Sequence, residues 1–223
     1  MKTRILTLCL LCLSLAATGQ QGISLSLVTG VGPNIETCHM VSSLGSSART
    51  RTYGYQVPAE VHLQYEAAKW RLGLSLGYRY AEEDLVYTRW QSGIYSGHYR
   101  SVTGIFTHLL RPGITAGYKF WQGGRHTVSV CASAGIQVPV HVRPENTTHP
   151  IQPYGAVGVE AAYTLGHDLQ LLYGAGLSVQ GGKAYQVPMI DYASELFTLH
   201  QVYYYPAITI GIKKIFALQG KKK

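Results

Sequence analysis

The sequence predicts an all-β protein, an eight-stranded antiparallel up-and-down β-barrel that crosses a membrane, with short turns at one end and long loops at the other. Three observations predict it. Residues 127–142 alternate without a break between apolar side chains and small, mostly polar ones. Seven further stretches alternate in a similar way, separated by connections that are long and short in turn. In every stretch one face is nearly free of charge.

The stretch 127–142 is the clearest of the eight. Its even positions, from Val128 to Val142, are all Val, Ala or Ile. Successive side chains of a strand point to opposite faces, so one face of this strand is wholly apolar. A tilted strand needs about 9–11 residues to cross a bilayer, whereas strands of soluble domains usually have about 5–6. The length and the pattern together favour a strand that meets lipid.

The N-terminal residues 1–19 have the pattern of a secretory signal peptide. Lys2 and Arg4 precede an apolar run over 5–17, and small residues follow at the expected cleavage site. The run is too short for a membrane-spanning helix, which needs about 20 residues. We therefore expect three segments: the signal peptide 1–19, the barrel domain 20–217 and a basic tail over 218–223.

The first four expected strands begin after the signal peptide. They cover residues 22–31, 53–65, 70–80 and 106–120. Most of the apolar and aromatic residues of each strand lie on one face, which includes Leu25, Tyr55, Leu74 and Ile114. The opposite faces carry Gly, Ser and most of the charged residues. This period of two is typical of strands with one face in an apolar environment.

The last four strands and the connections complete the pattern. The strands are expected at 127–142, 154–164, 169–180 and 202–216. The long connections are 32–52, 81–100, 143–153 and 181–199, and the short ones are 66–69, 121–126 and 165–168. A soluble barrel would place its charged faces outside. The nearly uncharged faces instead suit lipid, in which only a closed barrel satisfies every backbone group.

Aromatic residues gather near both ends of the expected strands, as in the interfacial girdles of membrane barrels. Near the short turns lie Tyr65, Trp70, Tyr118, Phe120, Trp121, Tyr163 and Phe216. Near the long loops lie Tyr53, Tyr55, Tyr80, Tyr154, Tyr203, Tyr204 and Tyr205. Their joint placement supports a membrane-spanning arrangement.

The signal peptide, the eight alternating stretches and the last strand I-T-I-G-I-K-K-I-F together resemble a known family. The chain is similar to the small outer-membrane β-barrel proteins of Gram-negative bacteria, the OmpA/OmpX-like group with its PorT-like members. The resemblance implies an outer-membrane location, periplasmic short turns and extracellular long loops. It also implies that Phe216 is part of the signal for the barrel assembly machinery, although residues 217–223 follow it.

If the apolar faces meet lipid, a charged and polar set faces the lumen. It comprises Glu60, His62, Arg71, Arg79, Arg111, Lys119, His141, Glu160 and Lys213. The interior of an eight-stranded barrel is just wide enough to be filled by side chains, and buried charges are usually paired. We therefore expect a buried polar network. The alternative is a narrow pore that favours anions, because five Lys and Arg residues in the set face two acids.

Catalysis, metal binding and nucleic-acid binding have little support. An outer-membrane lipid-modifying enzyme could assemble Ser129, His126 and an acid, but His126 is expected in a turn. The nine histidines show no metal-ligand spacing, and no motif implies a cofactor. Without Lys2 and Arg4 the chain keeps 17 basic against 11 acidic residues, and no basic stripe interleaves with aromatics. We expect a protein that is not an enzyme.

The long loops remain as the candidate binding surface, because loops on a rigid scaffold commonly carry function. The second loop is rich in aromatics, including Tyr87, Trp90, Tyr95 and Tyr99. The sequence therefore favours a structural or surface-interaction protein, whose partners are outer-membrane lipids and an extracellular ligand of the loops. A soluble periplasmic lipid-binding barrel, with its apolar faces inward, is the rival. We expect Cys38 and Cys131 to be free, since they fall at different depths.

Overall fold

The chain is described by a computed structural model, and its described residues contain nine segments of strand. The structure describes residues 22–42, 47–92, 95–143, 151–166, 168–181, 185–188 and 196–217. The expected signal peptide and basic tail lie outside these residues, as does the boundary at Gly19. Within the described part of the chain, no helix is long and apolar enough to span a membrane.

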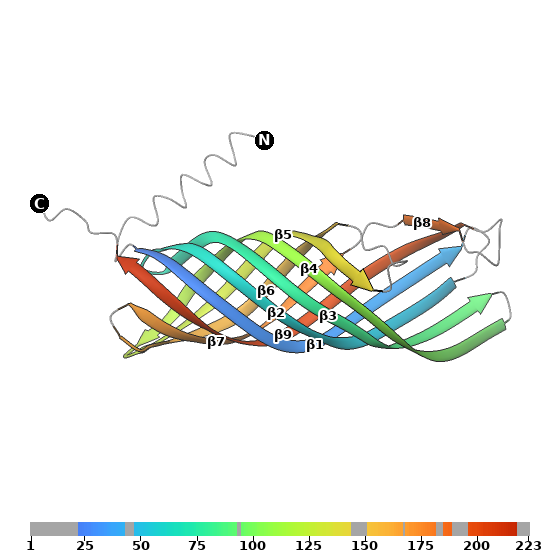
Figure 1. Cartoon of the computed structure of the whole chain (residues 1–223), viewed down its shortest axis with the longest axis horizontal. Helices are drawn as coiled ribbons and strands as arrows, with labels where there is room; N and C mark the ends of the chain where they lie inside the picture. Colours follow the sequence, from blue (N-terminus) through green and yellow to red (C-terminus); the bar gives the residue numbers. More distant parts are fainter. Residues whose placement is uncertain are drawn as a thin grey trace, which may run out of the picture.

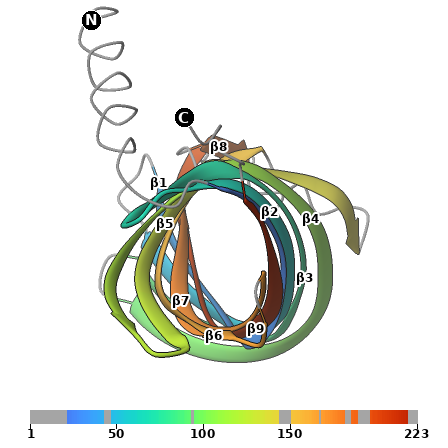
Figure 2. The ribbon, with the colours of Figure 1, turned by 90° about the vertical axis from the view of Figure 1, so that its left-hand side faces the viewer.

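Eight long antiparallel strands form a closed ring (Figure 1, Figure 2). They are β1 (Gly22–Ser42), β2 (Ser47–Glu66), β3 (Trp70–Ser92), β4 (Tyr95–Gly123), β5 (His126–Arg143), β6 (Gln152–Thr164), β7 (Leu169–Gly181) and β9 (Leu196–Ala217). Each strand pairs with its neighbour in the chain, and β1 pairs with β9 to close the ring. The short β8 (Tyr185–Pro188) pairs with the N-terminal residues of β9, from Leu196 to Leu199. This confirms the eight-stranded up-and-down barrel.

The apolar faces of the strands point away from the barrel axis. Ile208 is 72% exposed and Leu74 is 62% exposed, whereas Gln56 and Ser24 are fully buried in the interior. A protein folded in water would bury Ile208 and Leu74 and expose Gln56 and Ser24, because apolar burial is the main driving force for folding. The soluble lipid-binding barrel, which needs the apolar faces inward, is therefore contradicted.

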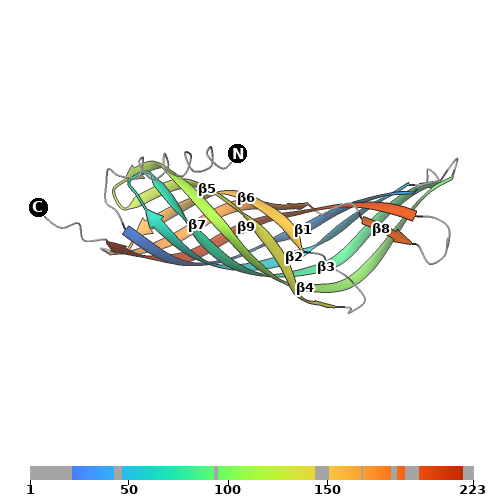
Figure 3. The same cartoon turned by 90° about the horizontal axis from the view of Figure 1, so that it is seen from above.

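Five of the strands, β1 to β4 and β9, are longer by several residues than the periodicity predicts. The expected loops 32–52 and 81–100 are mostly strand, since β1 and β2 stay paired up to Val41↔Ser47 and β3 and β4 up to Ser92↔Tyr95. These segments lack an apolar alternation because polar residues occur on both faces. Backbone pairing does not require that alternation once a strand has left the lipid. The result is an elongated sheet beyond one end of the barrel (Figure 3).

The opposite end has tight turns. The connection expected over 121–126 narrows to Gly124 and Arg125, because Gly123 pairs with His126. Gly124 has a φ of 58°, which glycine adopts without the steric cost of a Cβ. It holds the first central position of a two-residue hairpin, where a type II′ turn places glycine. The local sequence thus sets the turn and the pairing next to it, up to the register shift between Lys119 and Trp121.

Three tyrosines expected in the outer aromatic girdle lie inside the barrel instead. Tyr154, Tyr203 and Tyr205 are at most 7% exposed. Tyr53 and Tyr55, by contrast, are exposed on the outer face near the long-loop end. The inward position follows from the period of two, since Tyr154 shares a face with Glu160 and Tyr205 with Lys213. The aromatic girdle near the long loops is therefore built from fewer residues than expected.

Replacing Leu74 by Arg tests the orientation of the apolar band. We expect Leu74→Arg to lower the free energy of unfolding by roughly 2–4 kcal/mol, the cost of Arg on the lipid face near the bilayer midplane. Urea titration of the protein folded in lipid vesicles measures this value. Leu74→Ile is the matched control and should stay close to the parent. An unchanged midpoint for Leu74→Arg would contradict a lipid-facing position.

Candidate functional site

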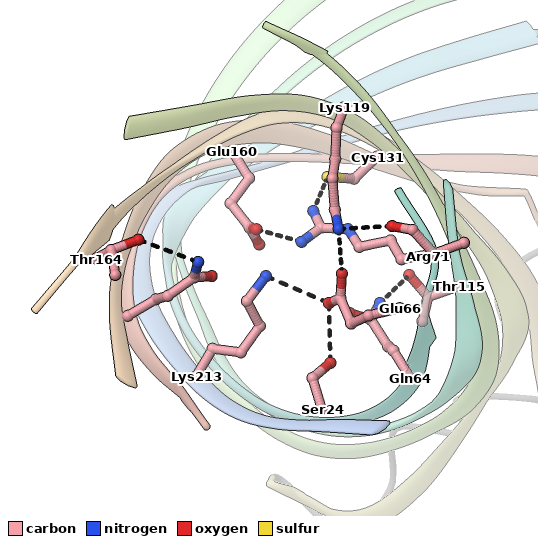
Figure 4. Close-up of polar contacts among 12 residues, drawn as sticks. Ser24, Gln64, Glu66, Arg71, Thr115, Lys119, Cys131, Glu160, Thr164 and Lys213 are labelled. Atoms are coloured by element: carbon pink, nitrogen blue, oxygen red, sulfur yellow. Dashed lines mark hydrogen bonds and ion pairs between the residues drawn. The ribbon is translucent and has the colours of Figure 1, made fainter. Parts of the chain in front are cut away.

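The end of the lumen near the short turns is organised around Glu66, which is 3% exposed. Its carboxylate forms ion pairs with Lys119 Nζ at 2.7 Å and with Lys213 Nζ at 3.3 Å, and it accepts a hydrogen bond from Ser24 Oγ at 2.9 Å (Figure 4). These residues come from β1, β2, β4 and β9. One acid therefore ties together strands on different sides of the ring.

Arg71 forms the second buried ion pair at this end. It comes from β3, is 3% exposed and pairs with Glu160 of β6 across the lumen (Figure 4). Its second terminal nitrogen donates to Cys131 Sγ. The guanidinium is thus held between a carboxylate and a thiol. The pair and the Glu66 cluster together cross the lumen in this region.

The middle of the lumen holds two further arginines. Arg111 Nη1 donates to Glu60 Oε1 at 3.0 Å, and Arg111 Nη2 donates to Ser178 Oγ at 2.7 Å. The Arg111 guanidinium lies 3.9 Å above the Tyr154 ring, and that of Arg79 lies 3.9 Å above the Tyr205 ring. Inward tyrosines thus act as flat supports for buried cations, an arrangement that stabilises them electrostatically.

A pocket of about 150 Å³ remains beside these side chains. Its lining includes Glu60, His62, Arg79 and Arg111 with the small residues Ala156, Gly158 and Gly176. His62 Nε2 lies 3.4 Å from Glu60 Oε2. The pocket is large enough for several water molecules, which polar walls can hold in place.

Eight of the nine expected lumen residues face the interior, and His141 does not. His141 is exposed, and its ring centroid lies 5.5 Å from that of His108 on the outer face. The reason is a β-bulge: His108 pairs with His141, but the next residue, Leu109, pairs with Pro139. One extra residue in β5 reverses which side chains point inward beyond it. The sequence 127–142 therefore alternates without a break, but the bulge changes which of its side chains point to the lumen.

Three acids that the sequence did not place in the lumen also face inward. Glu66 was expected in a turn, and Glu36 and Glu83 in long loops, yet all three are at most 7% exposed on the inner faces of β2, β1 and β3. Extending the alternation of β2 by one step from Gln64 would have found Glu66. Glu36 and Glu83 had no such pattern, because their neighbours are polar on both faces.

These acids change the charge balance of the interior. The described inward residues include five basic ones (Arg71, Arg79, Arg111, Lys119 and Lys213) and five acidic ones (Glu36, Glu60, Glu66, Glu83 and Glu160). The surplus of basic residues on which the anion-favouring pore rested is therefore absent from the described part of the interior. The net positive charge of the chain lies elsewhere.

The residues weighed for catalysis lie apart. Ser129 is buried in the lumen, whereas His126 is exposed and its ring centroid lies 4.9 Å from that of Tyr163. A separation of three residues puts two side chains of one strand on opposite faces. His126 and Ser129 therefore do not form a base–nucleophile pair. Among the described residues, no group of three or more His, Cys, Asp or Glu is placed to hold a metal ion.

The second candidate site is the part of the sheet beyond the apolar band, which we call the extension. It comprises residues 35–42 of β1, 47–53 of β2, 85–92 of β3, 95–102 of β4 and 197–204 of β9, all joined in register. On its inner face Glu36, Cys38 and Thr52 are buried, and on its outer face Arg49 and Arg51 are exposed. The extension is thus a paired sheet with two different faces. The side chains of Tyr87, Trp90, Tyr95 and Tyr99 lie outside the described part.

Both cysteines of the barrel domain are free, as expected. Cys131 lies in the lumen beside Arg71. Cys38 lies in the extension, opposite Thr50 and Gln201. Burial, and then the negative charge of Glu36, raise the pKa of the Cys38 thiol to about 12. This thiol is therefore protonated at neutral pH and is a poor nucleophile.

The comparisons with known proteins show the fold. No protein-family model matches the chain, and no curated protein matches its sequence. Neisserial surface protein A is 12% identical, with a TM-score of 0.50 over 86% of this chain and 96% of that one. The outer membrane protein OprG of Pseudomonas aeruginosa is also 12% identical, with a TM-score of 0.50 over 90% and 99%. The outer membrane protease OmpT of Escherichia coli, 10% identical over 90% and 100%, has a TM-score of 0.42, too low to support an argument.

Removing the acid of the Glu66 cluster tests whether it holds the barrel together. Glu66→Gln leaves Lys119 and Lys213 without their carboxylate, so we expect a loss of about 3–5 kcal/mol in the free energy of unfolding. Urea titration in vesicles measures it. Asp168→Asn is the control, because Asp168 and Lys214 are both about half exposed and their pair at 3.6 Å should contribute at most about 1 kcal/mol. Equal losses would contradict the assigned role.

The raised pKa of Cys38 predicts slow thiol chemistry. In a Cys131→Ser background at pH 8, we expect maleimide to react with Cys38 roughly a thousandfold more slowly in the folded protein than in urea, because the thiolate is scarce and buried. The rate should rise as the pH increases towards 12. An added Arg51→Cys in a Cys38→Ser background, on the exposed face, should react at an ordinary rate. Fast labelling of Cys38 in the folded protein would refute the burial.

Proposed function

We propose that this chain, an eight-stranded outer-membrane β-barrel protein, is a surface-interaction protein whose barrel is an anchor and whose extension is the working part. The observation that carries the proposal is the continuation of β1–β4 and β9 as paired strands beyond the apolar band. A paired sheet holds side chains in fixed positions outside the membrane. Fixed positions reduce the entropy lost on binding.

The interior supports the anchoring role. The Glu66 cluster and the pair of Arg71 with Glu160 connect strands across the lumen, and buried ion pairs of this kind resist separation. Eight-stranded barrels have just enough interior volume for such side chains. The interior thus contributes stability and takes up the space that a conducting path would need.

A small pore is the second candidate function. The pocket beside Arg79 and Arg111 is the observation that favours it, because two guanidiniums and His62 line the pocket together with the two acids Glu60 and Glu160. A pore would need a path past Glu66, where the side chains of Lys119 and Lys213 meet. An outer-membrane lipid-modifying enzyme has no comparable support, since Ser129 and His126 face opposite ways.

Electrical recording separates the anchor from the pore. We expect the purified, refolded chain to give no steady current in a planar bilayer, and Arg79→Ser to leave that result unchanged. Folding is checked by the faster migration of unboiled protein on SDS gels. A steady current with anion preference that Arg79→Ser reduces would favour the pore and overturn the anchoring role of the barrel.

Shortening the extension tests the surface role. In the shortened variant, residues 86–101 are replaced by Asn-Gly, which joins Leu85 to Val102 through a two-residue hairpin turn. We expect cells displaying the full chain, but not the shortened one, to bind immobilised extracellular-matrix proteins or glycans. Equal binding by both, with equal amounts of folded barrel in the outer membrane, would remove the proposal.

A further inference from the structure

The backbone register aligns basic residues across five strands of the extension. His39 of β1 pairs with His200 of β9 and with Arg49 of β2. Arg49 pairs with Arg89 of β3, which pairs with His98 of β4. A single row across the sheet therefore consists entirely of arginine and histidine.

The neighbouring row towards the membrane adds two arginines. Arg51 pairs with Thr37 and Tyr87, and Tyr87 pairs with Arg100. Neither row contains an acidic residue. Residues two apart in a strand share a face and lie about 6–7 Å apart. Arg49, Arg51 and Arg89 thus form a compact group of exposed guanidiniums, which we call the arginine face.

The like charges of the arginine face repel one another, and a bound anion would remove this repulsion. Arg49 and Arg89 are directly opposite in the ladder, where Cβ atoms lie about 4.5–5.5 Å apart and like charges destabilise the pairing. None of the ion pairs between described residues involves Arg49, Arg51 or Arg89. An external anion can bridge them, and guanidiniums bind phosphate through two parallel hydrogen bonds.

The position of the arginine face identifies the source of the anion. Along β2, Arg49, Arg51, Tyr53, Tyr55 and Val57 are all exposed on the same side of the sheet, so the arginines continue the lipid-facing surface. A strand that rises about 3.3 Å per residue with a tilt of about 40° climbs about 2.5 Å per residue along the membrane normal. Arg51 and Arg49 therefore lie about 5 Å and 10 Å beyond Tyr53.

The headgroup layer occupies this range of heights. It is roughly 5–8 Å thick on each side, the difference between the hydrocarbon core of about 30 Å and the whole bilayer of about 40–45 Å. Tyrosines favour the boundary between the two. Arg51 is placed within the layer, and the long side chain of Arg49 can bend back to it.

We propose that the arginine face binds the phosphate groups of an anionic lipid in the outer leaflet. Arg51 and Arg49 hold a phosphate at the headgroup level, and Arg89 adds the third cation from the neighbouring strand. The site requires only that the barrel sits in its membrane with the extension outside. It therefore goes beyond the surface role proposed above and does not depend on the ligand of the extension.

Lipid retention tests the site. The arginine variant combines Arg49→Gln, Arg51→Gln and Arg89→Gln, and the control variant combines Lys69→Gln, Arg125→Gln and Lys214→Gln. Each removes three exposed positive charges, the control at the opposite end of the barrel. All three proteins are refolded into vesicles of phosphatidylcholine with a minor fraction of phosphatidic acid, whose headgroup is a phosphate monoester. Native mass spectrometry then counts the phosphatidic acid that stays bound after transfer to mild detergent.

The parent and the control variant should retain phosphatidic acid over phosphatidylcholine, and the arginine variant should retain at least about tenfold less, because each basic residue near the surface contributes to binding anionic lipid. Equal retention by the arginine variant, or an equal loss in the control variant, would overturn the proposal. Heat-shifted mobility on SDS gels confirms that all three are folded.

A second arm separates lipid from soluble anions. The parent is refolded in phosphatidylcholine alone and mixed with heparin or inorganic phosphate at physiological salt. We expect weak binding that does not depend on the arginine face. Tight binding of heparin that the arginine variant loses would assign this surface to a soluble polyanion and overturn the lipid assignment.

Discussion

The structure depends on the closure of the sheet by the pairing of β1 with β9. In hydrocarbon no water is available to backbone N–H and C=O groups, so an unpaired strand edge would cost several kcal/mol for each exposed group. The β1–β9 register runs from Gly22↔Ala217 to Val31↔Ile208 and resumes from Ile35↔Tyr204 to Ser42↔Phe197, which closes the edge along nearly all of β1. Closure also creates an interior. Successive side chains of each strand then point alternately to the lipid and to the lumen.

The interior places a second constraint on the chain. Inward side chains are cut off from bulk water, and buried charges are stable only when they are paired. Glu66 forms ion pairs with two lysines, and Arg71 forms one with Glu160. The guanidiniums of Arg79 and Arg111 stack over tyrosine rings. Because the described inward residues include equal numbers of basic and acidic ones, the excess of basic residues in the chain lies on surfaces outside the lumen. The exposed arginines of the extension account for part of it.

The extension is a continuation of the same strand pairs beyond the membrane, where water replaces lipid around the sheet. Beyond the apolar band the ladder continues, but neither face needs to be apolar. The inner face can therefore bury Glu36 and Cys38, while the outer face can carry Arg49 and Arg51. Cross-strand register, which inside the membrane aligns apolar residues, here aligns basic residues from five strands. A site that no single strand encodes arises from the alignment of all of them.

The sequence by itself determined the number of long strands, the face of each that meets lipid, and the inward position of residues such as Arg71 and Lys213. These follow from a period of two, which links a side chain to a face using only its neighbours in the chain. Only the tertiary structure decided which residues meet across the ring, as Glu66 meets Lys213, and where a bulge turns His141 outward. It also decided that segments without apolar alternation are strands, and that Arg49 stands beside Arg89. These outcomes depend on register between strands, and register is set by the pairing of distant segments.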